Sequence, residues 1–122
     1  MHEKKRILVV EDDEVNLMIA EHILGREGYE VAKVNNGEEA IEIVRNQQFD
    51  MILMDIEMPI MDGLEATPLI RKLPNGRHVP IIALTAHSMP EKIEEFHKAG
   101  MDSHIIKPID QQKLKVVTDK YL

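Results

Sequence analysis

Five short apolar runs constrain the fold of this chain more than any other feature of its sequence. They are rich in Ile, Val, Leu and Met, and they occupy residues 7–10, 31–34, 51–54, 81–84 and 104–106. Short apolar runs of this kind are typical of buried strands. Longer stretches with helical spacing separate them, and strands that alternate with helices form a parallel sheet covered on both faces. The sequence therefore predicts an α/β domain.

The stretches between the runs carry apolar residues at intervals of three and four, which marks one face of a helix. The first helix has this spacing at Val15, Met18, Ile19, His22 and Ile23, and we expect these side chains to form its apolar face. Four further helices are marked in the same way by Ala40, Ile41 and Val44, by Leu64, Leu69 and Leu73, by Ile93, Phe96 and Ala99, and by Leu114, Val117 and Tyr121.

Polar residues at the expected helix starts support this assignment. Asn36, Asp62 and Ser88 each stand three residues before a glutamate, which is the spacing of a capping box. Asp110 is expected to cap the last helix.

Glycine and proline indicate where helices end or are interrupted. Gly28 and Gly100 stand where the first and fourth helices are expected to stop. Pro68 falls within the first two turns of the third helix, where an interior proline costs about 3 kcal/mol. We therefore expect this helix to start late or to kink.

Length and composition limit the class of protein. The 122 residues fit one domain over residues 1–122, and the absence of cysteine excludes disulfides and thiolate metal sites. A cytoplasmic location is compatible with this composition. No stretch approaches the roughly 18 apolar residues of a membrane span, and we expect no signal peptide. The net charge of −7 argues against direct binding of nucleic acid and favours a cationic partner or a metal ion.

Carboxylates follow the first and third expected strands. Glu11, Asp12 and Asp13 end the first strand, and Asp55 ends the third. Ligands of doubly wound sheets bind beyond these carboxyl ends. If the two strands are neighbours, the acids converge and repel one another, and a hard cation such as Mg²⁺ relieves the repulsion. Residues 11–14 could instead be a simple acidic helix start. A purely structural explanation is harder to find for Asp55, because it follows four apolar residues and has no basic neighbour in the sequence, so a functional role is favoured.

Thr85 ends the fourth strand and Lys107 ends the fifth, just before Pro108. Either residue alone is more often a loop cap or a surface lysine. With a metal site and an aspartate nucleophile, however, they complete the set of groups that phosphoryl transfer needs. Attack by an aspartate on phosphorus gives an acyl phosphate.

Four linked segments carry a family resemblance. They read ILVVED at 7–12, MDIEMPIMDG at 54–63, IALTA at 82–86 and KP at 107–108. In this order and spacing, the sequence closely resembles the receiver domains of two-component response regulators and hybrid histidine kinases. The resemblance implies a flavodoxin-like, doubly wound (βα)5 sandwich with a five-stranded parallel sheet of order 2-1-3-4-5.

The resemblance also implies roles for the strand-end residues. Asp55 would accept a phosphoryl group from a phosphohistidine on a histidine kinase or a histidine phosphotransfer protein. Asp12 and Asp55 would bind Mg²⁺ through carboxylates, Glu57 through its backbone carbonyl and Glu11 through water. Such a domain promotes its own phosphorylation and dephosphorylation but is not a turnover enzyme.

The remaining implied roles concern the phosphoryl group and the output surface. Thr85 and Lys107 would bind the phosphoryl oxygens, and the peptide bond between Lys107 and Pro108 would be cis. Thr85 and residue 104 would act as a switch. They would change the surface of the fourth helix, fifth strand and fifth helix, which would bind an unidentified output partner or form a dimer.

Several positions depart from the commonest family pattern or are variable. His104 stands where the family usually has Tyr or Phe, and it is either a working switch residue or a half-buried histidine of an edge strand. Glu57, Ala86 and His87 flank the site at variable positions, and we expect them to modulate how long the phosphoryl group persists.

Three rival functions would require other sequence features. A magnesium-dependent phosphatase with an aspartate nucleophile would need a second aspartate where Glu57 stands, and a cap domain. A flavin-binding module would need a loop rich in Ser, Thr and Gly after the first strand, in place of the four acids at 11–14. A docking-only pseudo-receiver would not need the intact set Asp12, Asp55, Thr85 and Lys107.

Overall fold

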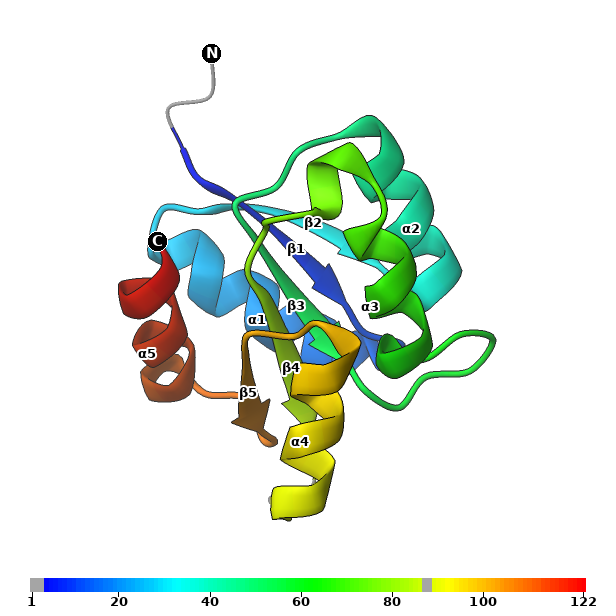
Figure 1. Cartoon of the computed structure of the whole chain (residues 1–122). Helices are drawn as coiled ribbons and strands as arrows, with labels where there is room; N and C mark the ends of the chain where they lie inside the picture. The colour runs from blue at the N-terminus through cyan, green and yellow to red at the C-terminus, as the bar shows by residue number, and fades with distance from the viewer. Residues whose placement is uncertain (1–3, 87–88) are drawn as a thin grey trace.

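A single parallel sheet forms the centre of the molecule. The computed structural model describes residues 4–86 and 89–122, and its sheet has the strand order β2-β1-β3-β4-β5 (Figure 1). The strands are β1 (Arg6–Val10), β2 (Glu30–Val34), β3 (Met51–Asp55), β4 (Ile81–Thr85) and β5 (Ser103–Ile106). All neighbouring strands pair in parallel. The predicted doubly wound sheet and its order are confirmed.

Helices connect the strands and cover both faces of the sheet (Figure 1). They are α1 (Glu14–Arg26), α2 (Gly37–Asn46), α3 (Gly63–Arg71), α4 (Pro90–Ala99) and α5 (Gln111–Tyr121), with a short 3₁₀ helix, η1 (Pro74–Gly76), after α3. None of the helices in the described part of the chain is long and apolar enough to cross a membrane.

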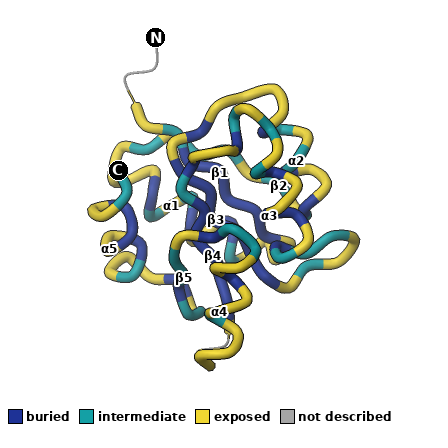
Figure 2. The backbone as a smooth tube through the Cα atoms, in the orientation of Figure 1, coloured by how far each residue is buried: buried dark blue, intermediate teal, exposed yellow. Residues whose placement is uncertain are grey.

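Alternation along β1 divides the core into two layers, because successive strand side chains point to opposite faces. Ile7 and Val9 pack with buried residues of α1 and α5. Leu8 and Val10 pack with buried residues of α2, α3 and α4. The central strands β1 and β3 are buried almost throughout, whereas the outer faces of the helices are exposed (Figure 2).

The predicted apolar face of α1 is wrong. Its buried residues are Leu17, Ala20 and Leu24, whereas Val15 and Met18 are 63% and 66% exposed. Ile19 and His22 are exposed as well, whereas Ile23 is partly buried and packs against the core, as predicted. Both sets have helical spacing, so periodicity alone cannot select between them, and the crossover from β1 to β2 decides which side meets the sheet. An apolar stripe therefore remains on the outside of α1.

Most of the predicted helix boundaries are confirmed. Asn36 and Asp110 accept hydrogen bonds at the starts of α2 and α5, and Asp62 forms a complete capping box with Glu65. Helix α1 ends two residues before Gly28, which has a φ of 93°. Helix α4 ends at Gly100, whose φ of 111° suits a residue without a Cβ.

The start of α4 corrects one prediction. Met89 is the N-cap residue and Pro90 is the first helical residue, so the helix does not begin after Ser88. The fixed φ of proline suits the first position of a helix, and this preference outweighs the capping-box spacing. Ser88 itself lies outside the described residues.

Helix α3 starts earlier than Pro68 led us to expect. It begins at Gly63 and continues through Pro68 to Arg71, so the predicted late start is wrong, whereas the alternative of a kink at Pro68 stays a prediction. The capping box of Asp62 sets the helix start, and burial of Ala66 and Ile70 against the sheet holds the helix together across the proline.

Candidate functional site

Acidic side chains from two strand ends meet at one edge of the sheet. β1 and β3 are neighbours, with Val10 in register with Met54, so the residues that follow each strand emerge side by side. Glu11 is 1% exposed and Asp55 is 2% exposed, whereas Asp12 is exposed to solvent. One carboxylate oxygen of each of these three acids lies within 4.8 Å of the others. The predicted convergence of Glu11, Asp12 and Asp55 is confirmed.

Asp13 has a different task from its acidic neighbours. Its carboxylate caps α1 by accepting hydrogen bonds from the backbone N–H groups of Val15 at 2.8 Å and Asn16 at 3.2 Å. The Asn16 side-chain amide in turn donates to Oε1 of Glu11 at 2.6 Å. The simpler interpretation as an acidic helix start therefore holds for Asp13, while Glu11 belongs to the site.

Lys107 brings a positive charge to these acids. Its Nζ lies 3.1 Å from Oδ1 of Asp55 and 3.2 Å from Oε1 of Glu11. The backbone N–H of Lys107 donates to the carbonyl oxygen of Thr85 at 2.7 Å, which ties the end of β5 to the end of β4. The peptide bond between Lys107 and Pro108 is cis, as the resemblance implied.

A second lysine holds the loop that carries Lys107. Nζ of Lys113, on α5, donates to the carbonyl oxygens of Ile106 at 2.9 Å and Pro108 at 3.0 Å, the residues on either side of Lys107. Lys113 was not predicted from the sequence. Its hydrogen-bond partners are backbone carbonyl groups of a loop, and the sequence does not reveal the shape of that loop.

Thr85 is buried at the end of β4, in register with Ile106 of β5. β4 lies between β3 and β5, so Thr85 ends at the same edge of the sheet as Asp55 and Lys107. His104 is half-buried on β5 and in register with Ala83 rather than with Thr85. The coupling of His104 to Thr85 therefore stays a prediction.

The surroundings of Asp55 change its ionisation. Burial raises the pKa of Asp55 to about 7, and the hydrogen bond and negative charge of Glu11 act in the same direction, against the Lys107 ammonium. Burial alone would lower the pKa of Lys107. The nearby carboxylates of Asp55 and Glu11 have the larger combined effect and raise the pKa of Lys107 above its ordinary value. One lysine thus faces more negative charge than it neutralises.

The donor set fits magnesium. Mg²⁺ prefers oxygen ligands and commonly takes one or two carboxylates, and this edge offers three carboxylates that converge without enough positive charge. Glu57 lies at the rim, with its backbone N–H donating to Oδ1 of Asp55 at 3.2 Å. The backbone-carbonyl role of Glu57 stays a prediction, as do the modulating roles of Glu57 and Ala86. His87 lies outside the described residues.

The loop between β3 and α3 packs tightly against Asp55. Met61 N–H donates to the carbonyl oxygen of Pro59 at 2.8 Å across Ile60, whose φ of 71° is rare for a branched residue. A Cβ added at Gly63 would collide with the carbonyl oxygen of Asp55. Gly63 was not predicted to shape the site, because the close approach of the Asp55 backbone is set by how α3 packs against the end of β3.

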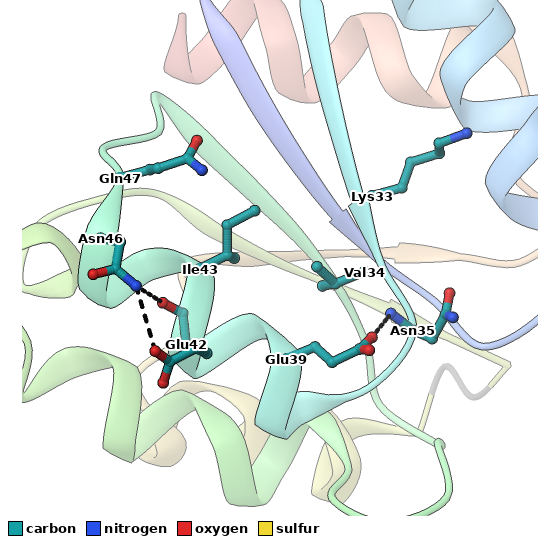
Figure 3. A pocket seen from close by; sticks show the side chains of 8 residues that line it. All are labelled: Lys33, Val34, Asn35, Glu39, Glu42, Ile43, Asn46 and Gln47. Atoms are coloured by element: carbon teal, nitrogen blue, oxygen red, sulfur yellow. Dashed lines mark hydrogen bonds between the residues drawn. The ribbon is translucent and has the colours of Figure 1, made fainter.

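A separate hollow lies between β2 and α2, and its lining does not include Glu11, Asp12 or Asp55 (Figure 3). Its volume is about 440 Å³. The Asn46 amide donates to the carbonyl oxygen of Glu42 at 3.0 Å, and the Asn35 backbone N–H donates to Oε1 of Glu39 at 2.7 Å (Figure 3). These polar groups of the lining form hydrogen bonds with one another, so they do not indicate a catalytic or binding function for the hollow.

The comparison with known families agrees with the geometry of the site. Residues 7–119 match the model of the response regulator receiver domain. The chain is a response regulator receiver domain. Such domains occur in response regulators and in hybrid histidine kinases, and both kinds of protein are found among the relatives of this receiver.

Two curated relatives illustrate these two settings. Probable histidine kinase 1 of Oryza sativa subsp. indica is 40% identical, and the match covers 98% of this receiver but 16% of the kinase. The polar-differentiation response regulator DivK of Brucella anthropi is 35% identical, and the match covers 97% of this receiver and 96% of DivK. The receiver thus spans less than a fifth of the kinase and nearly all of the regulator.

Two solved structures resemble this receiver closely. The receiver domain of a sensor histidine kinase from Pseudomonas aeruginosa, solved with a magnesium ion in its active site cleft, has a TM-score of 0.90 and 39% identity, over 97% of each chain. The chemotaxis protein CheY4 of Vibrio cholerae has a TM-score of 0.93 and 29% identity, over 98% of this receiver and 99% of that chain.

Proposed function

We propose that this receiver, as one domain over residues 1–122, accepts a phosphoryl group on Asp55 from a phosphohistidine. One observation carries the proposal: a buried Asp55 lies 3.1 Å from the Lys107 ammonium and shares its edge of the sheet with the carboxylates of Glu11 and Asp12. Phosphoryl transfer depends on positioning and charge neutralisation, and this arrangement supplies both.

The transfer exchanges one bond to phosphorus for another. The phosphorus–nitrogen bond of the donor breaks while a bond forms between phosphorus and a carboxylate oxygen of Asp55. The electron pair leaves with the donor imidazole, which then takes up a proton. Lys107 neutralises charge on the transferred oxygens, and the Thr85 hydroxyl donates a hydrogen bond to one of them.

Magnesium would be held by the carboxylates of Asp12 and Asp55 and the backbone carbonyl of Glu57, with Glu11 acting through water. When bound, it neutralises negative charge on the acids and on the phosphoryl oxygens. Of the protein residues, Lys107 opposes the effect of burial on Asp55 and favours its ionised form, since a neutral carboxyl group is a poor nucleophile.

The phosphohistidine-bearing partner would dock on the outer face of α1. Val15, Met18 and Ile19 are exposed there, directly after the acidic loop that carries Asp12. An exposed apolar stripe beside a functional edge marks an interaction surface. The partner expected is a kinase or phosphotransfer domain that presents its histidine within an apolar patch, flanked by basic groups that complement the net charge of −7.

The output would leave through α4, β5 and α5. A groove of about 250 Å³ lies along β5 and α5, and it is lined by His104, Lys113 and the exposed Val116. Phosphorylation would draw Thr85 toward the phosphoryl group, and His104 would follow, which shifts the population of two surface conformations. An output partner is the proposed occupant, and self-association of the phosphorylated receiver is the competing outcome.

Intact-protein mass spectrometry tests the proposal. The receiver is incubated with Mg²⁺ and acetyl phosphate, and one phosphoryl increment per chain is expected. Asp55→Asn should abolish the increment, whereas Asp119→Asn, on the exposed side of α5, should keep it. An increment that persists in Asp55→Asn overturns the proposal.

The same incubation, with a parallel sample in which a phosphoester replaces acetyl phosphate, separates the rival functions. A docking-only protein would gain no increment, and a phosphatase would release many phosphates per chain from phosphoesters. We propose that the receiver is a signalling domain rather than a turnover enzyme, and that it works in the cytoplasm, with which its lack of cysteine is compatible.

A further inference from the structure

Asn16 connects helix α1 to the acidic edge of the sheet. Its side-chain amide donates to Oε1 of Glu11 at 2.6 Å, and the same oxygen lies 3.2 Å from Nζ of Lys107. Glu11 is almost fully buried and Asn16 is half-buried. The Glu11 carboxylate is therefore held from two directions, by a neutral donor on α1 and by a cation from the loop after β5.

The position of Asn16 in its helix makes this contact specific. It is the third residue of α1, where a polar side chain commonly turns back to the backbone N–H of the cap residue. The Asn16 amide turns toward the end of β1 instead. The Asp13 carboxylate accepts a hydrogen bond from the backbone N–H of Asn16 at 3.2 Å and so fixes the backbone of Asn16. The side chain of Asn16 in turn fixes the carboxylate of Glu11.

Glu11 needs such a fixed partner. The negative charge of nearby Asp55 repels it, and the Lys107 ammonium that attracts it is shared between both acids. An amide donor orients a carboxylate without changing the charge of the site. Hydrogen bonds that orient the carboxylates around a metal typically contribute 10- to 100-fold to metal affinity.

We infer that Asn16 is a positioning residue of the magnesium site and acts by holding the Glu11 carboxylate toward the cation. The inference rests on the proposed magnesium site, but it needs no phosphoryl transfer. It also extends the proposed metal site to α1, the helix that is proposed to bind the phosphohistidine-bearing partner, because Asn16 belongs to that helix.

Magnesium titrations followed by the amide chemical shifts of the receiver test this inference. Asn16→Ala should weaken Mg²⁺ binding by about 10-fold. In a Glu11→Gln background, the same substitution should have little further effect, because the carboxylate that Asn16 orients is gone. Asn16→Ser, too short to reach Glu11, should reproduce the loss.

Asn46→Ala is the matched control, since this asparagine also donates from a helix to a glutamate, but in α2. Its Mg²⁺ affinity should equal that of the wild type. An Asn16→Ala affinity within two-fold of the wild type overturns the inference, and so does an equal loss in the Glu11→Gln background. A wild type that binds no Mg²⁺ instead overturns the proposed metal site, so the two failures are distinct.

Discussion

Nζ of Lys107 lies 3.1 Å from Oδ1 of Asp55, although the strands that lead to these residues are not neighbours. Lys107 follows β5 and Asp55 ends β3, with β4 between them. The lysine therefore reaches across the end of the central strand that carries Thr85. This geometry places one cation above three strand ends, where a transferred phosphoryl group would meet it.

Replacement of Lys107 by an uncharged residue of similar size should test its role in charge neutralisation while the chain still folds. Lys107→Met removes the ammonium but keeps most of the side-chain volume, so phosphorylation by acetyl phosphate should slow by on the order of 100-fold. Time-resolved intact mass spectrometry measures the rate. Lys98→Met, which removes an exposed lysine of α4, should leave the rate unchanged. Equal rates for Lys107→Met and the wild type would contradict the proposed role.

The raised pKa of Asp55 predicts a pH-dependent stability without magnesium. Its pKa is about 7 in the folded chain and close to its ordinary value of 3.8 in the unfolded chain, so the folded state binds more protons between these values. The contribution of Asp55 to stability is present below about pH 4 and is lost as the pH rises toward 7. Asp55→Asn should remove this loss and raise the free energy of unfolding at pH 8 by on the order of 2 kcal/mol.

Urea denaturation in EDTA at several pH values measures this difference between Asp55→Asn and the wild type. Titrating groups that do not contact Asp55 act alike in both proteins, so the difference reports on Asp55 together with its partners Glu11 and Lys107. Asp119→Asn serves as the control because its carboxylate is exposed. A difference that does not grow between pH 4 and pH 8 would refute the raised pKa.

The exposed stripe on α1 predicts a variant that distinguishes two phosphoryl donors. Met18→Lys should change the free energy of unfolding by less than about 0.5 kcal/mol, because Met18 is 66% exposed. Transfer from a phosphorylated histidine phosphotransfer protein should slow at least several-fold. Phosphorylation by acetyl phosphate, which needs no docking surface, should proceed at the wild-type rate.

Val116→Lys is the control for this surface, because Val116 is a similarly exposed apolar residue on α5. It should leave both donors unaffected. If Met18→Lys and Val116→Lys slow transfer from the phosphotransfer protein equally, the α1 stripe is not the docking surface.

Gly63 predicts a local cost in stability. A Cβ at this position would collide with the carbonyl oxygen of Asp55 and approach Cγ of Met54 at 2.8 Å. Gly63→Ala should therefore lower the free energy of unfolding by about 2 kcal/mol, measured by urea denaturation. Gly25→Ala is the matched control, because no atom lies within 4 Å of the new methyl group, and it should stabilise α1 by roughly 0.5–1 kcal/mol. Similar effects of both substitutions would contradict the close approach.

The sequence was sufficient to predict which strand ends carry the site. Asp55, Thr85 and Lys107 each follow a short apolar run, and parallel strands bring such positions to one edge. Pairing of β1 with β3 is not evident from spacing, and the strand order came from the family resemblance. Once these strands are neighbours, the approach of Glu11 to Asp55 follows.

Other features depend on tertiary contacts that periodicity does not encode. Helix α1 carries two apolar stripes, and only packing on the sheet reveals that Leu17 rather than Met18 is buried. Asn16 and Lys113 were missed because polar residues at helix starts have many partners available to them. Their actual partners, Glu11 and the carbonyl groups beside Lys107, are set by how each helix meets the sheet.

Glu11 and Lys107 are bonded across 96 positions of the sequence. During synthesis, the ribosome completes Asp55 and its acidic neighbours long before it reaches the lysine that balances them. A nascent or truncated chain that ends before Lys107 therefore lacks the cation that faces Asp55. The proposed phosphorylation of Asp55 therefore depends on the segment that follows the last strand, because this segment supplies the cation.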